Sequence, residues 1–315
     1  MDIKKTLLIG LLLLSVNFYG QGFETQKKFS LPEEMNFEDF IKNSQKVNEF
    51  YSFYHSQYLY YDLYIDNEEG DLFQMEYSLR FRKRIINDSV ENYTFQLKDE
   101  MSLGKEIRME IEEKELDFYN VIYDKKWVPL TAVLDTVFEL YNDLLTQKDS
   151  NSFFKNLFLI EKWIKTKANG PIAPFQKLRH IDSVMFNEKK ISSFKPVLVG
   201  SSIRKRAHIY VDSEYTTQQK IPFNRKNKEE TPMFFQENTQ YNWLFESSLD
   251  YSNFVYLVNF KKTIVKEYEV ENKFISPEKG QELLNKHEKT VLEKLELAIK
   301  YDSKFKQSIQ HFNKQ

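Results

Sequence analysis

The chain has 315 residues, of which 41% are apolar, 16% aromatic and 29% charged, so a globular core is expected and extensive disorder is excluded. The formal net charge is −2 and the pI is near 6.3, which gives no overall basic field for binding nucleic acid. No cysteine is present, which excludes disulfides, thiolate metal sites, a catalytic cysteine and a lipid-modified cysteine.

The N-terminal segment has the pattern of a secretory signal over residues 1–22. Lys4 and Lys5 precede an apolar run at 6–16, which is shorter than the ~20 residues that a membrane span needs. Cleavage is expected at Gly20-Gln21-Gly22 or directly after Gln21; the alternative is an uncleaved amphipathic anchor. The segment predicts an exported protein, periplasmic or secreted, with no stable membrane span after cleavage.

The first part of the mature chain is predicted to be mostly strands. A strand is expected over Phe23–Leu31, ended by Pro32, and a helix over Phe37–Val47. From residue 51 to 116 the apolar period changes to two, which predicts successive strands. These strands are expected at Tyr58–Tyr64, Gln74–Arg84, Asn92–Lys98 and Lys105–Leu116.

The rest of the chain changes from helices back to strands. Apolar residues at helical spacing predict helices over Leu130–Leu145 and Ser152–Lys167. A C-terminal helix is expected from Ser276, where Pro277 fits the first turn. Between them, strands are predicted at Lys195–Asp212, Asn242–Leu249, Phe254–Phe260 and Thr263–Phe274, with a long polar loop at Thr216–Thr239. This order indicates an α+β fold with an antiparallel sheet.

Several predicted strands carry charged residues on one face, since residues two apart along a strand share a face. Arg80 and Arg82 lie opposite Leu79 and Phe81. Similar rows are Thr94-Gln96-Lys98, Arg108-Glu110-Glu112, Arg204-Arg206-His208 and Glu267-Glu269-Glu271.

These rows favour particular ligands. Adjacent glutamates repel unless they are solvated, paired or metal-bound, and their oxygens suit Mg²⁺ or Mn²⁺. Rows of Arg and Lys suit a polyanion, because guanidinium groups bind phosphate bidentately. If the sheet closes into a barrel, both kinds of row point inward and outer helices cover the apolar faces. The alternative is an open sheet whose wet face carries cross-strand salt bridges.

Short charged motifs follow one another along the chain. They are Glu24-Thr25-Gln26-Lys27-Lys28-Phe29, Tyr60-Tyr61-Asp62, Leu79-Arg80-Phe81-Arg82, Phe95-Gln96-Leu97-Lys98 and Arg108-Met109-Glu110-Ile111-Glu112, followed by Arg204-Lys205-Arg206, Asp250 and Glu269-Val270-Glu271. In this order they resemble the ExExKF, YxDT, LRxR, LTLK and RxExE strands, and the later basic and acidic strands, of the CYTH or triphosphate tunnel metalloenzyme superfamily.

The resemblance implies an antiparallel β-barrel with outer helices over residues 23–302, a helical insertion at about 117–193 and a C-terminal tail at 303–315. It implies metal-dependent hydrolysis of a triphosphate-bearing small molecule, inorganic tripolyphosphate or a nucleoside triphosphate, with Mg or Mn as cofactor. The implied phosphate-binding residues are Lys28, Arg80, Arg82, Lys98, Arg108, Arg204 and Arg206, and the first four of these also carry the catalytic assignment. The implied metal ligands are Glu24, Glu110, Glu112, Asp250, Glu269 and Glu271.

One position departs from the family pattern. Gln26 stands where the opening motif has its second glutamate, and an amide cannot supply a negative charge to a metal. The departure keeps open a non-catalytic exported protein of the same fold that binds a polyanion or polyphosphate. A structural envelope protein with an ordinary amphipathic sheet is the third interpretation. The sequence assigns neither the natural substrate nor the oligomeric state.

Overall fold

The computed structural model describes residues 22–32, 34–99, 107–114, 116–146, 151–212, 214, 240–272, 277–295, 297–300 and 304–313. The predicted signal segment, except Gly22, and the predicted loop at 216–239 lie outside these residues. Their assignment therefore stays a prediction.

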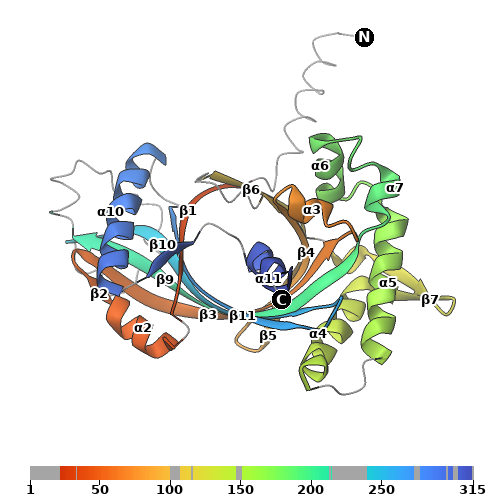
Figure 1. The fold of residues 1–315 in the computed structure, drawn as a ribbon, viewed down its shortest axis with the longest axis horizontal. Helices are drawn as coiled ribbons and strands as arrows, with labels where there is room; N and C mark the ends of the chain where they lie inside the picture. Colours follow the sequence, from red (N-terminus) through yellow and green to blue (C-terminus); the bar gives the residue numbers. More distant parts are fainter. Residues whose placement is uncertain are drawn as a thin grey trace, which may run out of the picture.

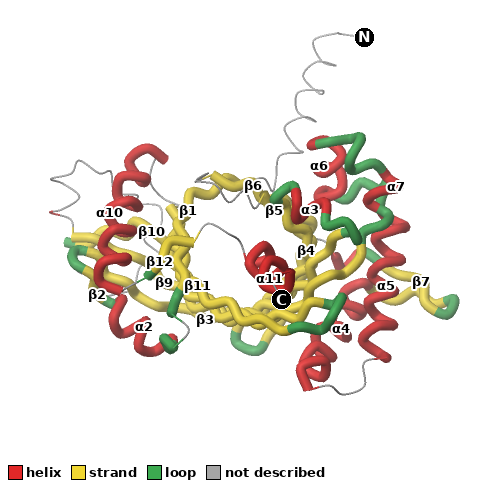
Figure 2. Tube along the Cα trace, in the orientation of Figure 1, coloured by secondary structure: helices red, strands yellow, loops and turns green. Residues whose placement is uncertain are grey.

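The architecture is an antiparallel β-barrel with helices around it (Figures 1 and 2). The strands follow one another in the order β11-β10-β9-β3-β4-β5-β6-β1, and β1 pairs with both β6 and β11, which joins the two ends of the sheet. Their bounds are β1 (Gly22–Ser30), β3 (Phe50–Asp66), β4 (Tyr77–Ile86), β5 (Ser89–Asp99), β6 (Ile107–Glu113), β9 (Lys195–Asp212), β10 (Tyr241–Tyr256) and β11 (Lys262–Asn272). The predicted fold class is confirmed.

Short strands complete the sheet and form one separate hairpin. Strand β2 (Lys46–Val47) pairs with β3, and β12 (Ala298–Lys300) pairs with β1. Strands β7 (Asn120–Tyr123) and β8 (Lys126–Pro129) form the separate hairpin. The tight turn between β4 and β5 places Asn87 and Asp88 at φ values of 49° and 62°. Asn and Asp tolerate this left-handed region, which hairpin turns of this kind require.

One group of helices covers the outward face of β3, β4 and β5. Between β6 and β9 the chain forms the 3-10 turn η1 (Leu116–Phe118), the β7–β8 hairpin, α4 (Leu130–Thr146), α5 (Asn151–Lys167), α6 (Ala173–Ile181) and α7 (Glu188–Ile191). Phe81, Phe95 and Trp163 pack together in this core, with ring centroids 4.4 to 5.7 Å apart. Burial of these large rings fixes which side of β4 and β5 faces outward.

A second group covers β1, β10 and β11. Helices α2 (Phe37–Ser44) and α10 (Pro277–Leu295) place Phe40, Leu283 and Leu284 in a cluster with Phe29 and Tyr268 of the barrel. Asn36 caps α2, since its side chain accepts a hydrogen bond from the Asp39 N–H. Among the described residues, no helix combines the length and the apolar character needed to cross a membrane.

The C-terminal helix α11 (Lys304–Asn313) lies within the outline of the barrel when the molecule is viewed as in Figure 1. The ring of Phe305 stacks on that of Tyr64 with centroids 4.9 Å apart, and Ile309 joins the same cluster. The short helix α3 (Asp71–Gln74) is close by, since Phe73 contacts Phe305. Residues 304–313, which belong to the predicted C-terminal tail, therefore form a helix in contact with the barrel.

Several predicted element boundaries are corrected. The helix predicted over Phe37–Val47 ends at Ser44, because Lys46 and Val47 pair with β3. The segments predicted as two strands at 242–249 and 254–260 belong to one strand, β10, whose residues 250–253 continue the pairing with β9 and β11; this strand ends at Tyr256, and residues 257–260 lie outside it. The insertion includes the β7–β8 hairpin and is therefore not entirely helical.

Candidate functional site: the charged barrel interior

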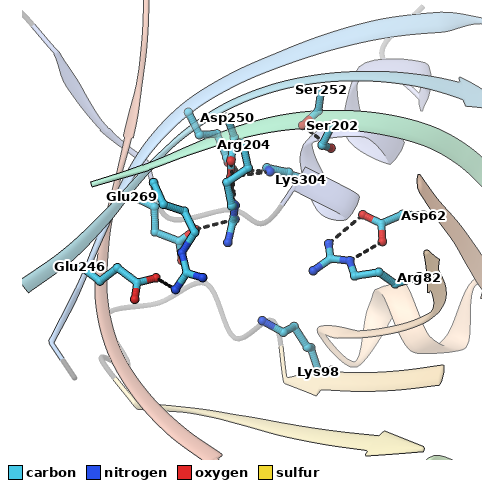
Figure 3. Close-up of polar contacts among 12 residues, drawn as sticks. Asp62, Arg82, Lys98, Ser202, Arg204, Glu246, Asp250, Ser252, Glu269 and Lys304 are labelled. Atoms are coloured by element: carbon cyan, nitrogen blue, oxygen red, sulfur yellow. Dashed lines mark hydrogen bonds and ion pairs between the residues drawn. The ribbon is translucent and has the colours of Figure 1, made fainter. Parts of the chain in front are cut away.

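The barrel interior is lined by side chains that alternate with the outward apolar ones. In β4, Leu79 and Phe81 are completely buried against the insertion, so Arg80 and Arg82 project to the other side of the strand. Figure 3 shows polar side chains of several strands and of α11 gathered in this interior: Asp62, Arg82, Lys98, Ser202, Arg204, Glu246, Asp250, Ser252, Glu269 and Lys304.

Asp62 of β3 forms ion pairs with both inward arginines of β4. Arg82 donates from Nε to Oδ1 at 2.7 Å and from Nη2 to Oδ2 at 2.8 Å, a bidentate pair across directly opposed strand positions. Arg80 lies 3.7 Å from the same carboxylate. It donates from Nε to Gln96 Oε1 at 2.9 Å and from Nη1 to the Tyr64 hydroxyl at 3.1 Å. These bonds fix both guanidinium groups in orientation.

Strands β5 and β6 continue the lining. Lys98 lies directly opposite Glu110 and forms an ion pair with it at 2.9 Å. Gln96 lies opposite Glu112 and donates a hydrogen bond to it, and Lys114 is 3.2 Å from the same glutamate. The predicted metal ligands Glu110 and Glu112 are therefore paired with groups of their own wall in this structure.

The strands β9 and β10 form a second bidentate pair. Arg204 donates from Nε to Asp250 Oδ1 at 2.8 Å and from Nη2 to Oδ2 at 2.6 Å, and its Nη2 is 3.4 Å from Glu269. Arg206, two residues further along the same face, pairs with Glu246. The structure brings together the predicted residues Arg204, Asp250 and Glu269.

Carboxylates oppose one another across β10 and β11. Asp250 lies directly opposite Glu267, and Glu246 lies directly opposite Glu271. Asp250 and Glu267 are both completely buried. Like charges placed across a strand pair are destabilising, so these pairs depend on nearby cations. Arg204 is one such cation for Asp250, and Lys304 of α11 is another at 2.6 Å.

The nearby cations lower the pKa values of the buried carboxyl groups. Burial alone would raise the pKa of Asp62 and of Glu110, but neighbouring cations outweigh it. Arg82 and Arg80 lower the pKa of Asp62 to about 2, while Lys98 and Arg80 lower that of Glu110 to about 2. Both groups are thus held ionised at neutral pH.

Two carboxyl groups of β10 and β11, those of Asp250 and Glu269, also have lowered pKa values. Burial would raise the pKa of Glu269, but the charges of Lys28 and Arg204 lower it to about 2. Lys28 of β1 lies directly opposite Glu269. The pKa of Asp250 lies far below its ordinary value, because Arg204 and Lys304 outweigh the effect of burial. These four carboxylates, of Asp62, Glu110, Asp250 and Glu269, are therefore charged although they are largely buried.

Other predicted positions are placed by their strand register alone. Glu24 lies opposite Arg108 in the β1–β6 pairing, and Gln26 lies opposite Glu271 in the β1–β11 pairing. The side chains of Glu24, Gln26 and Arg108 lie outside the described part of the structure. Gln26 thus occupies a strand position next to the acidic row of β11.

His208 shares the inward face with Arg206. Its ring lies 3.7 Å from that of Trp243 and 4.1 Å from that of His55, measured between centroids. Its buried Nδ1 has no hydrogen-bond partner. Burial, together with the charge of His55, lowers the pKa of His208 to about 3, so the ring is neutral at pH 7. His208 belongs to an aromatic part of the lining.

The donor set of the acidic strands suits a hard divalent cation. Buried carboxylate oxygens are the ligands that Mg²⁺ and Mn²⁺ prefer, and Glu267 Oε2 is buried without a hydrogen-bond partner. Among the described residues, however, no three His, Asp or Glu side chains are arranged around a common metal position. Asp250 already accepts bonds from Arg204 and Lys304. In this arrangement, the charge of Asp250 is balanced by Arg204 and Lys304.

The sequence interpretation missed some of these residues. Asp62 belongs to a motif of the resemblance but received no role, although it binds Arg82. Glu246 was not singled out, although it lies two strand periods from Asp250 on the same face. No sequence pattern indicated Lys304 as a site residue, because a lysine in a short C-terminal helix is usually exposed at the surface.

A cavity of about 600 Å³ lies outside the barrel lining, between the β3–α3 connection and α7. Two of its three lysines already have acidic partners: Lys190 is 2.7 Å from Asp71, and Lys195 is 2.6 Å from Glu68. This cavity has a mixed, locally paired charge. The barrel interior, with its opposed rows, is the stronger candidate for a highly charged ligand.

No family model matches the chain, and no curated protein matches it. Three solved structures that resemble it are HpAC1 from Hippeastrum, an adenylyl cyclase candidate described as having a dominant triphosphatase activity (13% identity, covering 90% of this chain and 93% of that one, TM-score 0.45); PH1819 from Pyrococcus horikoshii (13%, 91% and 99%, 0.42); and an adenylate cyclase candidate from Bacillus halodurans (14%, 87% and 90%, 0.39). The barrel fold of this chain is established by its own strand pairings.

Proposed function

We propose that this chain hydrolyses a phosphoanhydride bond of a triphosphate-bearing small molecule, inorganic tripolyphosphate or a nucleoside triphosphate, inside the barrel. The observation that carries the proposal is the clustering of fixed guanidinium groups from the two strands that flank β3: Arg80 and Arg82 from β4, and Arg204 and Arg206 from β9. A triphosphate presents charged oxygens along its whole length, which is the ligand that such a lining suits.

The cationic residues would bind and orient the phosphates. Lys28, Lys98 and the inward arginines would donate to phosphate oxygens and offset the charge that develops during phosphoryl transfer. Their present carboxylate partners hold them in place before the ligand binds, so little reorganisation is required. Arg108 lies on β6 and is proposed for the same role from its strand position.

The carboxylates would hold Mg²⁺ or Mn²⁺. The proposed ligands remain Glu24, Glu110, Glu112, Asp250, Glu269 and Glu271. Such an ion, when bound, neutralises phosphate charge and lowers the pKa of a bound water. The chain's own contribution is to present the buried, ionised carboxylates of Asp250 and Glu269 next to the phosphate-binding groups.

A second candidate function is binding without hydrolysis. Gln26 supports it, because a residue with a neutral side chain holds the strand position opposite Glu271, where the family pattern has a glutamate. An exported protein of this kind would bind a polyanion or polyphosphate through the same cations. Export is itself a proposal that rests on the N-terminal sequence.

Phosphate release from tripolyphosphate and from ATP, with Mg²⁺ or Mn²⁺, tests the first proposal. Arg206→Gln removes an inward charge, and the matched control is Lys205→Gln, on the outward face of the same strand. Release that falls at least tenfold in R206Q and stays unchanged in K205Q supports hydrolysis in the barrel. Binding without release supports the second function, and the absence of both contradicts the site.

A further inference from the structure

The C-terminal helix places a cation inside the acidic part of the barrel. Lys304 Nζ lies 2.6 Å from Asp250 Oδ2 and 3.9 Å from Glu267 Oε2. Figure 3 shows Lys304 reaching from α11 toward Asp250. The lysine is the first residue of α11, so its position depends on where this helix is docked.

The two carboxylates that Lys304 meets need a cation. Asp250 and Glu267 are directly opposed across β10 and β11, and neither is exposed to solvent. Arg204 is paired with both oxygens of Asp250. Glu267 accepts one hydrogen bond, from Gln307 Nε2 to its Oε1 at 2.8 Å, while its Oε2 accepts none. A buried carboxylate oxygen without a hydrogen bond, facing a second carboxylate, is the arrangement that a hard cation completes.

Docking of the helix does not rest on Lys304 alone. Phe305 is buried against Tyr64, Ile309 belongs to the same apolar cluster, and Lys306 pairs with Glu76 at 2.7 Å. The helix therefore has an apolar anchor and a separate ion pair. Replacing the Lys304 ammonium removes the cation and leaves these other contacts of the helix intact.

We propose that Lys304 is an internal cation that stands in for a divalent ion at the Asp250–Glu267 pair, so that helix α11 and the metal compete for this end of the acidic wall. The inference rests on the proposed function, because it concerns the metal of the same barrel. It adds that the metal content of the barrel depends on the position of the C-terminal helix.

Mn²⁺ binding to the full chain, followed by electron paramagnetic resonance and by calorimetry without any triphosphate, tests the proposal. Lys304→Gln removes the ammonium, and Lys289→Gln, at an exposed lysine of helix α10, is the control for loss of one positive charge. We expect K304Q to bind Mn²⁺ at least tenfold more tightly than the parent chain, and K289Q to bind it as the parent does. Adding Glu267→Gln to K304Q is expected to abolish the gain.

Equal Mn²⁺ affinity in K304Q and the parent chain would overturn the proposal, as would a gain that survives Glu267→Gln. If K304Q is destabilised, the unfolding temperature gives a second readout. Mn²⁺ should then raise that temperature more in K304Q than in the parent, and an equal rise contradicts the proposal. Mn²⁺ binding as expected without phosphate release would refute the proposed hydrolysis while leaving this inference standing.

Discussion

The two halves of the barrel wall differ in how their charges are balanced. On β4 and β5, Arg80, Arg82 and Lys98 project inward; Asp62 of β3 pairs with Arg82, and Glu110 of β6 pairs with Lys98. On β9, β10 and β11 the described carboxylates outnumber the arginines; they are Glu246, Asp250, Glu267, Glu269 and Glu271, against Arg204 and Arg206. The basic half, β4 and β5, is therefore suited to phosphate oxygens, and the acidic half, β9 to β11, is suited to cations, so that a metal-bound triphosphate would contact both.

The largest expected effect comes from breaking the basic half at its central pair. Arg82→Ala leaves Asp62 buried at 1% exposure, with Arg80 at 3.7 Å and the charge of Lys304 as weaker compensation. Loss of one partner of a buried ion pair costs about 3 kcal/mol or more, because the other charge stays uncompensated. Chemical denaturation should show this loss, and the double variant Asp62→Asn/Arg82→Ala should recover part of it. A single variant as stable as the parent would contradict the pairing.

A substitution in the acidic half is expected to weaken metal binding instead. Asp250→Asn removes the charge that Arg204 and Lys304 share. Mn²⁺ affinity should fall about tenfold or more, since a carboxylate is replaced by a neutral amide. Tripolyphosphate binding measured without metal should fall far less. Equal losses in both measurements would show that the two halves do not divide their roles.

Acid should destabilise the fold in two stages. Burial lowers the pKa of His287 to about 3, and burial with the charge of His55 does the same for His208, whereas an unfolded histidine titrates near ~6.5. At these two histidines the unfolded chain therefore binds more protons below about pH 6.5, and their contribution to stability falls as the pH falls toward 3; burial raises the pKa of Asp66 to about 6, which offsets part of this loss. Asp62 and Glu110, with pKa values of about 2, add a steeper loss between ~4 and ~2.

Denaturation at a series of pH values measures both stages. His287→Phe should flatten the first stage by up to about 1.4 kcal/mol per pH unit, since one titrating group is removed. The carboxylate stage should remain in that variant. Stability that rises on acidification from pH 6 to pH 4 would contradict the assignment of both histidines.

A smaller effect is expected at the Tyr64 hydroxyl. Arg80 Nη1 donates to this oxygen at 3.1 Å, so Tyr64→Phe removes one hydrogen bond and keeps the ring stacked on Phe305. Loss of such a bond costs about 1 to 2 kcal/mol. Denaturation should show this cost, together with a modest weakening of tripolyphosphate binding. The outward control Lys205→Gln should stay within about 0.5 kcal/mol of the parent.

Much of the barrel could be predicted from the sequence, because a two-residue period records which face of a strand is buried. Leu79 and Phe81 alternate with Arg80 and Arg82, and the structure buries the first pair against α5. Strand β9 was predicted with the bounds that the structure gives it. The break placed within β10 came from Asp250 and Ser252, which are polar yet buried, because Arg204 and Ser202 bond to them.

The partners of the site residues could not be predicted in the same way. Pairing of Lys98 with Glu110, or of Arg204 with Asp250, depends on strand register, which a single sequence does not specify. Lys304 reaches Asp250 across 54 residues of chain, through the docking of a helix that carries few signals of its own. Local sequence patterns predict the charged rows, whereas long-range contacts determine which charges pair with one another and which are available to bind a ligand.

A structure of the chain crystallised with tripolyphosphate and Mn²⁺ tests most directly whether the barrel interior binds a metal-bound triphosphate. We expect phosphate oxygens within hydrogen-bond distance of Arg80 or Arg82 on β4 and of Arg204 or Arg206 on β9, with Mn²⁺ bound to carboxylates of β10 and β11. Tripolyphosphate bound outside the barrel, at Lys190 and Lys195 of the surface cavity, with the interior ion pairs unchanged, would contradict it.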